Sequence, residues 1–220
     1  GLMAAHHTGI TELNYDSFIP VASMTGSPQY LAVRSSAPYN TLEEFIEYAK
    51  RHPGEVKVGA TLKTISHIWP AILAKLAGVE FKYVAYEGTG QRVQALAGGF
   101  IDAICVDYPS GYQFVKIGKF NFLASATPKR LEMTPDIPTM RELGYDIIWD
   151  VKRGIVFPKG TSQDKVVVLE EALRKVAHDE DYIRDIETAG GDVEFMGFEQ
   201  YQSYLEKLNK AISDVAGVIK

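Results

Sequence analysis

The chain has 220 residues, of which 46% are hydrophobic and 23% are charged, a composition typical of a globular protein with a substantial core. Its formal net charge is −5, so no overall positive field draws it to nucleic acid or to anionic lipid. The single cysteine, Cys105, excludes an internal disulfide, and the longest apolar runs are shorter than the ~20 residues that span a bilayer.

Strand and helix patterns alternate through the first half of the chain. The helix at 40–54 is well marked, because Thr41 and Glu44 match a capping box and Pro53-Gly54 ends the segment. In chain order, the predicted elements are a strand at 30–35, this helix, a strand at 55–59, a helix at 67–77, and strands at 81–86, 100–106 and 120–126 with a helix at 90–97 between the first two. Strands separated by helices predict an α/β fold with a mainly parallel, doubly wound sheet.

The second half begins with a segment rich in proline and charge, in which Thr139 is placed to cap a short helix. The change in composition predicts a boundary between two lobes near its end. The further predicted elements are strands at 146–151 and 154–158, helices at 164–178 and 180–190, a strand at 193–197 and a closing helix. One face of the closing helix, which is therefore expected to pack on a core, carries Phe198, Tyr201, Leu205, Leu208, Ile212 and Val215.

A glycine-flanked turn, Gly88-Thr89-Gly90, stands between a predicted strand and a predicted helix. It does not match a nucleotide-binding fingerprint, because Val93 stands where the third glycine of G-x-G-x-x-G belongs, and no P-loop lysine follows. Glycines let a ligand approach the backbone closely, and free amides at a helix start favour an anion. The turn is a candidate anion site, with a plain βα turn as the alternative.

A second loop runs from Ala60 to Ser66. The helix after it is predicted to start near Ser66 or His67, because a proline such as Pro70 is best tolerated in the first turn. Hydroxyl groups that could hold a carboxylate stand on Thr61, Thr64 and Ser66. The alternative is that Thr64 or Ser66 simply caps the helix. Both loops follow strands in one βα register, so they are expected at the carboxyl edge of one sheet, where open α/β sheets bind ligands.

Patterns for catalysis or metal binding are weak. His67 could act as a general base, but the sequence has no G-x-S-x-G motif to provide a nucleophile for it. Cys105 lies in an apolar strand, where a thiol packs in the core. His6 and His7 have no Asp, Glu or Cys beside them at metal-ligand spacing, so no metal and no cofactor are expected. Asp107 at a strand end could accept a hydrogen bond from a ligand, with a solvated aspartate as the alternative.

The phrases "YEGTGQRVQALAGGFIDA", "PDIPTMRELGY" and "RGIVFPKGTSQDKV", in this order and spacing, resemble the extracytoplasmic solute receptors of tripartite tricarboxylate transporters, also called Bug receptors. The stretches "NYDSFIPVASM" and "SSAPYNTLEEFIEYAKRHPGEVKVG" fit the same family, so the resemblance covers essentially the whole chain.

This resemblance implies a two-lobed periplasmic-binding architecture of type II, with residues 1–24 and 143–220 in the first lobe and 25–142 in the second. It implies a periplasmic, monomeric receptor without catalytic activity, which closes on a small carboxylate and delivers it to integral membrane transporter subunits, with no nucleic acid as partner. Gly88, Thr89 and Gly90 would form one ligand loop, Ala60 to His67 the other, and Arg153 would lie at the return into the first lobe. Tyr86 and Trp149 are candidates for lining the cleft, with core packing as the alternative for each.

The sequence also departs from the family pattern. No strand and glycine-rich loop precede Gly1, so the first lobe is expected to be incomplete. Lys63 adds a positive charge to the second loop, so the identity of the ligand does not carry over from the family. The rival interpretations are the effector domain of a transcription regulator, which shares the two-lobed fold, and an enzyme on the same scaffold.

Overall fold

The computed structural model describes residues 2–215, except the side chain of Val215, and divides into two compact units. Unit 1 contains residues 2–27 and 151–215, and unit 2 contains residues 28–150. The chain passes between them twice, inside the long strand β1 (Phe18–Arg34) and at the start of β6 (Asp150–Pro158). The sequence predicts the lobe boundaries a few residues earlier, at 24/25 and 142/143. Residues 1 and 216–220 of the predicted first lobe lie outside the described residues.

Unit 2 is built on a sheet with the strand order β3-β2-β4-β1-β5. Its strands are the C-terminal part of β1, β2 (Lys57–Ala60), β3 (Lys82–Ala85), β4 (Ala103–Asp107) and β5 (Phe120–Ser125). Strand β2 pairs in parallel with β3 and β4, whereas β1 runs antiparallel to both β4 and β5. Four strands therefore point in one direction, and the α/β class with a mainly parallel sheet is confirmed.

The strand predicted at 30–35 differs from the expectation, because it is the end of β1 and runs against its neighbours. Two strands that follow one another in the chain through a helix are usually parallel. Strand β1 does not follow or precede β4 or β5 in this way, so nothing imposes a parallel arrangement on it. The buried positions of β1 continue on both sides of residue 28, so its hydrophobic pattern is set by both units.

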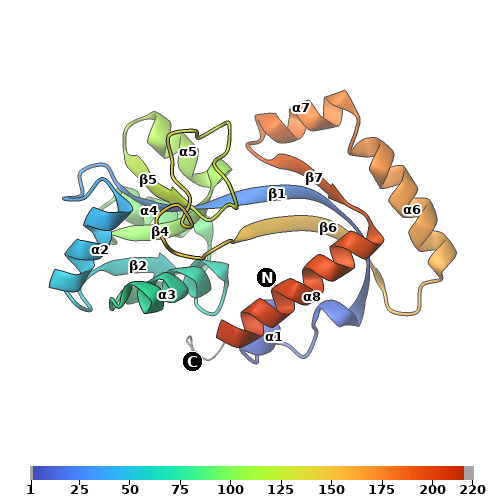
Figure 1. Ribbon diagram of the computed structural model, residues 1–220, viewed down its shortest axis with the longest axis horizontal. Helices are drawn as coiled ribbons and strands as arrows, with labels where there is room; N and C mark the ends of the chain where they lie inside the picture. The colour runs from blue at the N-terminus through green and yellow to red at the C-terminus, as the bar shows by residue number, and fades with distance from the viewer. Residues whose placement is uncertain (1, 216–220) are drawn as a thin grey trace. The chain divides into compact units, whose positions relative to one another are not determined.

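Four helices surround this sheet, namely α2 (Leu42–Arg51), α3 (Ile65–Ala77), α4 (Thr89–Ala97) and α5 (Tyr108–Lys116) (Figure 1). The predicted cap of α2 is confirmed, since Thr41 Oγ1 accepts the N–H of Glu44 at 3.2 Å. The Glu44 carboxylate accepts the N–H of Asn40 at 2.7 Å, so the box closes one residue earlier than the usual pattern. Two free amides at the helix start are satisfied in this way.

Helix α3 starts earlier than predicted. It begins at Ile65, which places Pro70 inside the helix and not in its first turn. The proline removes one main-chain hydrogen bond, that to the carbonyl of Ser66, close to the helix start. The helix ends as expected at Gly78, which has a left-handed backbone with φ of 65°.

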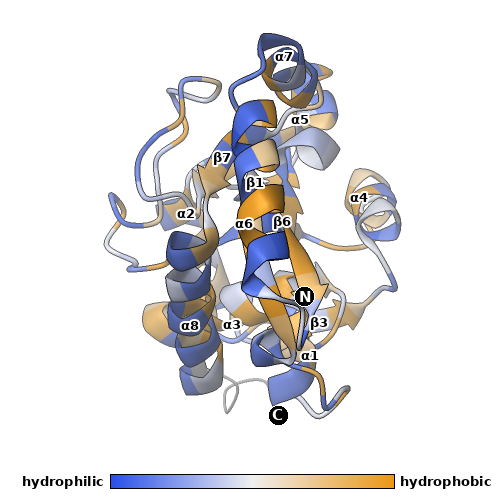
Figure 2. Ribbon diagram, turned by 90° about the vertical axis from the view of Figure 1, so that its right-hand side faces the viewer, coloured by the Kyte–Doolittle hydropathy of each residue, from blue (hydrophilic) through white to orange (hydrophobic). Residues whose placement is uncertain are grey.

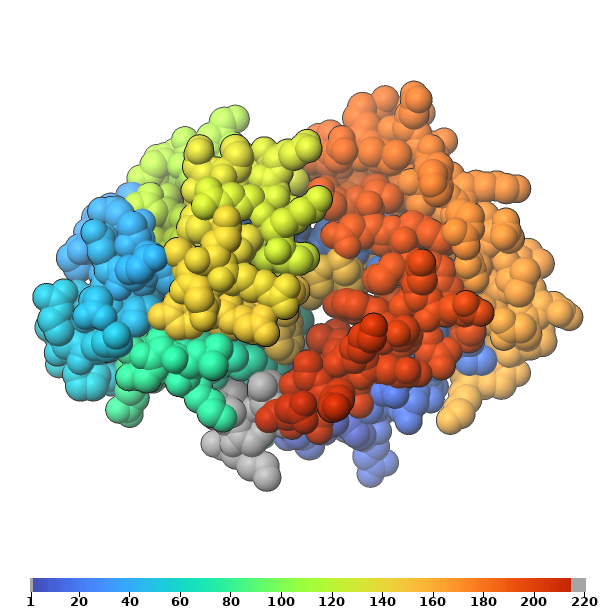
Figure 3. Space-filling model, in the orientation of Figure 1, coloured from blue at the N-terminus to red at the C-terminus, as the bar shows by residue number. Residues whose placement is uncertain are grey.

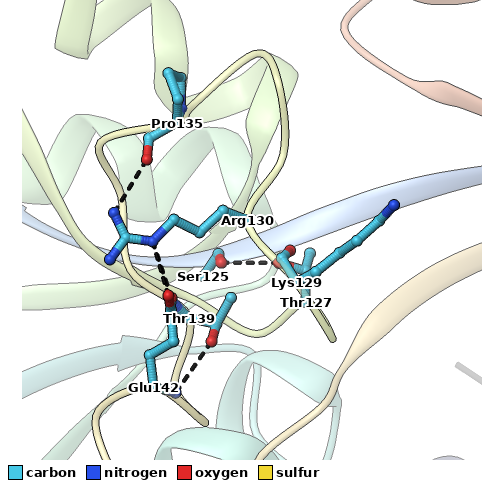
Figure 4. Close-up of polar contacts among 7 residues, drawn as sticks. All are labelled: Ser125, Thr127, Lys129, Arg130, Pro135, Thr139 and Glu142. Carbon is cyan, nitrogen blue, oxygen red and sulfur yellow. Dashed lines mark hydrogen bonds and ion pairs between the residues drawn. The ribbon is translucent and has the colours of Figure 1, made fainter.

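The segment after β5, residues 126–149, is irregular but strongly hydrogen-bonded (Figure 4). Thr139 and Glu142 form a reciprocal pair, in which Thr139 Oγ1 accepts the N–H of Glu142 at 3.1 Å and the carboxylate accepts the N–H of Thr139 at 2.7 Å. Arg130 binds the same carboxylate at 2.9 Å. The short helix predicted here is wrong, because the turn capped by Thr139 ends at Gly144, which has φ of 86°. Figure 3 shows the segment, in yellow, on the surface of its unit.

Unit 1 contains β6, β7 (Asp192–Met196) and the N-terminal part of β1, with which both of these strands pair. Its helices are α1 (Leu2–His7), the short 3-10 helix Tyr15–Ser17, α6 (Gln163–Val176), α7 (Glu180–Thr188) and α8 (Phe198–Val215). The two strands predicted at 146–151 and 154–158 form only one, β6. Residues 146–149 belong to unit 2, where the main-chain N–H of Trp149 donates to Ala126 O at 2.7 Å.

Helix α8 packs on the core of unit 1, as its pattern predicts. Tyr201, Leu205 and Ile212 are buried, Phe198 and Leu208 are partly buried, and Val215 lies outside the described side chains. Figure 2 shows hydrophilic residues along much of the rest of this helix. Among residues 2–215, no helix combines the length and apolar character needed to cross a membrane.

Candidate functional site

The predicted ligand loops lie at one edge of the unit 2 sheet. Ala60 at the end of β2 is paired with Ala85 at the end of β3, and the N–H of Tyr86 donates to Ala60 O at 2.9 Å. The two loops therefore leave the sheet from neighbouring positions, as predicted. The site residues predicted from the sequence at this edge are Ala60, Thr61, Thr64, Ser66, His67, Tyr86, Gly88, Thr89, Gly90 and Asp107.

The hydroxyls of Thr64 and Ser66 hold the first loop together. Thr64 Oγ1 donates to Thr61 O at 2.7 Å, so its one hydrogen is used there. In the 3.1 Å contact between Thr64 and Ser66, Ser66 is consequently the donor. Ser66 Oγ also accepts the N–H of Thr61 at 2.9 Å. These two hydroxyls are donors within the loop, whereas the Thr61 hydroxyl has no partner among residues 2–215.

Lys63 and His67 are coupled through the same loop. Lys63 has φ of 62°, a left-handed conformation that costs energy in a residue other than glycine. Its N–H donates to Nδ1 of His67 at 3.3 Å, so the neutral imidazole carries its hydrogen on Nε2. Burial lowers the pKa of His67, which favours this neutral form. His67 thus directs one N–H donor away from Lys63.

The start of α4 is open. Gly88 is the N-cap and provides no side-chain cap, and the N–H groups of Thr89 and Gly90 have no acceptor in the described part of the chain. A Cβ added at Gly88 or Gly90 would meet no atom within 4 Å, and neither residue has a positive φ. The fold therefore does not require glycine at these two positions. Their effect is to leave free space in front of unpaired amides, an arrangement that suits an anion.

Gly59 provides the contrast within the same unit. A Cβ on this residue of β2 would clash with Ile101 Cδ1, so the Ile101 side chain would have to move to admit one. Tyr86 belongs to the same packing, because its ring lies against Gly59 and joins the core cluster. Tyr86 therefore has a packing role, and its place as a residue lining the cleft stays a prediction.

A buried arginine that sequence reasoning missed lies under the first turn of α4. Arg92 is only 6% exposed, and its guanidinium donates from NH1 to Cys105 O at 2.7 Å and from NH2 to Thr89 Oγ1 at 2.8 Å. Burial lowers the pKa of Arg92, and the nearby Asp107 opposes that change. The available signal was a charged residue next to the apolar positions Val93 and Leu96 of a helix that starts at the predicted loop.

Asp107 closes the start of α5. Its Oδ1 accepts the N–H of Ser110 at 3.0 Å, and Pro109 in the first turn has no N–H to offer. The prediction that Asp107 reaches a ligand therefore competes with a structural role that uses the same carboxylate. A negative charge at this helix start disfavours an anion there.

Arg153 and Trp149 lie away from these loops in the chain. Arg153 belongs to β6 in unit 1, where its NH1 donates to Ser27 Oγ. Trp149 is buried, and its indole N–H has no acceptor among the described residues.

The site offers little for catalysis. Burial raises the pKa of the Cys105 thiol to about 12, so it is not a ready nucleophile. Within residues 2–215, no group of three His, Cys, Asp or Glu side chains gathers in a way that could hold a metal ion. The open donors at the edge favour the binding of an anion.

Comparison with known proteins identifies the family. The model of the tripartite tricarboxylate transporter family receptor matches residues 3–215. A UPF0065 protein of Cupriavidus necator, from the gbd 5' region, is 30% identical over 215 residues, which cover 96% of this chain and 64% of that protein. The chain spans between 50% and 64% of the length of the first three curated relatives it matches.

Solved structures show the same fold. A TctC solute binding protein from Polaromonas has a TM-score of 0.82 at 27% identity, covering 99% of this chain and 74% of that one. MatC of Rhodopseudomonas palustris, solved with bound malate, has a TM-score of 0.81 at 25% identity, covering 97% and 76%. The periplasmic-binding architecture expected from the sequence is confirmed by these likenesses. The chain belongs to the receptor family of the tripartite tricarboxylate transporters.

Proposed function

We propose that this protein is a periplasmic solute-binding receptor that captures a small organic carboxylate and delivers it to the membrane subunits of a tripartite tricarboxylate-type transporter. The family match supports a receptor, and it gives no support to the effector domain of a transcription regulator. In this proposal the protein acts as a monomer, without catalytic turnover, cofactor or nucleic acid.

The observation that carries the proposal is the open start of α4. Two glycines that the fold does not need leave the amides of Thr89 and Gly90 accessible. Two N–H groups at a helix start can bind the two oxygens of a carboxylate, and the helix dipole favours its charge. The Thr89 hydroxyl adds a third donor on the same turn.

The neighbouring loop supplies the remaining donors. The Thr61 hydroxyl and the Nε2–H of His67 have no hydrogen-bond partner in the described part of the chain, whereas Thr64 and Ser66 shape the loop. In this proposal Ala60, Thr64, Ser66 and Tyr86 position the loops, and Asp107 holds α5. Arg153 remains a predicted ligand residue of unit 1.

Malate is the first probe for the ligand, because a relative of 25% identity was solved with malate bound. The test is a thermal-shift screen of the chain against malate, other mono-, di- and tricarboxylates, and the neutral amides of the same compounds. At about 100 times its dissociation constant, a ligand stabilises by roughly 2.7 kcal/mol, or about 5–10 °C for a chain of this length.

A shift with one class of acid and none with its amide is the expected result. If no carboxylate shifts the transition at millimolar concentration while the chain is folded by circular dichroism, the proposed function is wrong.

A further inference from the structure

Arg92 is a buried cation without an ion pair. Its exposed fraction is 6%, and among residues 2–215 no carboxylate oxygen lies within ion-pair distance of its guanidinium. Its Nε is fully buried and has no hydrogen-bond partner there. Buried charges are normally paired, because an unpaired charge costs several kcal/mol of desolvation. Among residues 2–215, the guanidinium therefore has no negative charge in direct contact with it.

The nearest titratable groups compensate the charge of Arg92 only in part, since no carboxylate of residues 2–215 lies within ion-pair distance of its guanidinium. Asp107 interacts with Arg92 electrostatically, but its carboxylate caps α5 by accepting the N–H of Ser110. The Cys105 thiol beside it stays protonated, because burial raises its pKa. The group of Cys105 that accepts a hydrogen bond from Arg92 is its main-chain carbonyl, which is neutral.

The contact between Arg92 and Thr89 fixes the direction of a hydroxyl. A guanidinium can only donate, so Thr89 Oγ1 is the acceptor in their 2.8 Å hydrogen bond. The hydrogen of the Thr89 hydroxyl must then point elsewhere. Since Thr89 is the first residue of α4, this donor belongs to the same turn as the unpaired amides of Thr89 and Gly90.

We propose that Arg92 is the specificity-determining residue of this turn, holding the Thr89 hydroxyl as a donor and supplying the buried positive charge that a ligand oxyanion neutralises. The inference rests on the proposed function and deepens it. The turn selects a fully ionised oxyanion over the neutral acid or amide of the same shape, because only the ion compensates the guanidinium.

The test is a double-mutant cycle with the variants Thr89→Val, Arg92→Met and the double variant. The dissociation constant for malate is measured by calorimetry at constant ionic strength, and that for sulfate, as an inorganic oxyanion, is measured in parallel. Each single substitution is expected to weaken binding about tenfold or more, since each removes a hydrogen bond that involves a charged group. The double variant should lose less than the two losses added together, because Arg92 acts partly through Thr89.

Three controls separate positioning from charge and from folding. Thr89→Ser keeps the hydroxyl and should lose much less affinity than Thr89→Val. Arg92→Lys keeps the charge but cannot bridge Thr89 and the Cys105 carbonyl, so it should restore only part of the affinity. Arg51→Met removes an equal charge from the exposed face of α2 in the same unit and should leave binding unchanged.

The urea midpoint of Arg92→Met, measured without ligand, distinguishes a binding role of Arg92 from a purely structural one. Removing an unpaired buried charge should leave the midpoint of Arg92→Met unchanged or raise it. A lower midpoint together with unchanged affinity would assign Arg92 to the core and overturn the inference.

The outcomes also distinguish the inference from the proposed function. If the wild type binds malate and Arg92→Met binds it equally well, the receptor stands and the inference fails. If no carboxylate binds but sulfate stabilises the wild type and not Arg92→Met, the receptor proposal fails and the inference stands. If neither anion registers on the wild type, both are overturned.

Discussion

The carboxylate of Asp107 accepts the N–H of Ser110 at 3.0 Å and so caps α5 from the end of β4. Replacing such a cap by alanine typically costs about 1 kcal/mol. We therefore expect Asp107→Ala to lower the free energy of unfolding by about that amount in urea titration, and Asp107→Asn to lower it less, since the amide oxygen still accepts.

The same substitutions test whether Asp107 contacts the ligand. Both remove a negative charge near Arg92, so the affinity for malate should stay the same or rise. A large loss of affinity in Asp107→Asn, with stability retained, would show that the aspartate binds the ligand directly.

Gly90→Ala should change stability and binding in opposite directions. A Cβ meets no atom within 4 Å, and alanine favours a helix over glycine by roughly 0.5–1 kcal/mol. The variant should therefore unfold at a higher temperature while binding malate more weakly, because the methyl group narrows the approach to the amides. Gln94→Ala, on the exposed face of α4, is the control and should leave binding unchanged. Unchanged affinity in Gly90→Ala would place the ligand elsewhere.

Gly154→Ala tests the packing of unit 1. A Cβ on this residue of β6 would lie 2.6 Å from the Ala22 carbonyl oxygen and 2.7 Å from the Tyr201 ring. A backbone atom cannot move aside easily, so overpacking should cost about 1–3 kcal/mol. Urea titration measures this loss, and Val156→Ala, which is 41% exposed on the same strand, should cost much less. Equal midpoints for the two variants would contradict the pairing of β6 with β1.

His67 should give the protein a pH dependence. Burial lowers its pKa from the usual 6.5, so the unfolded chain binds this proton more tightly than the folded one. The free energy of unfolding should therefore fall as the pH falls below 6.5, and continue to fall until the folded pKa is passed. Protonation of Nδ1 also removes the acceptor for the Lys63 N–H. His67→Gln should flatten this part of the stability profile, and identical profiles for both proteins would refute the assignment.

Local signals in the sequence predicted α2, α3 and α4 of unit 2, but they missed α5 and wrongly placed a short helix after Thr139. The Thr41 cap and the Gly78 end are decided by residues within one turn, and both form as expected. Long-range pairing was less predictable. Nothing in "YLAVRS" reveals that this strand continues back to Phe18 or that it runs antiparallel to β4, because direction depends on partners distant in the chain.

The sequence predicted which loops form the candidate site, but it did not predict the roles of the individual side chains. The turn at Gly88 was identified because glycines and helix starts have general consequences for ligands. The roles of Asp107 and Arg92 depend on which groups lie within hydrogen-bond distance. The cap on Ser110 had a local signal, an aspartate followed by a proline at the second helical position. The contact of Arg92 with Cys105 O joins a helix to a strand, and no local signal in the sequence predicts it.

The central claim is that a carboxylate binds at the first turn of α4, and two-dimensional amide NMR of the labelled chain during a malate titration tests it most directly. Hydrogen bonding to an anion should shift the Thr89 and Gly90 amide signals most, in a saturable way, with smaller changes at Thr61 and His67. Saturable shifts that are largest at Gln200 and Lys207, which line a hollow of unit 1, would contradict the claim, as would the absence of any shift at millimolar malate.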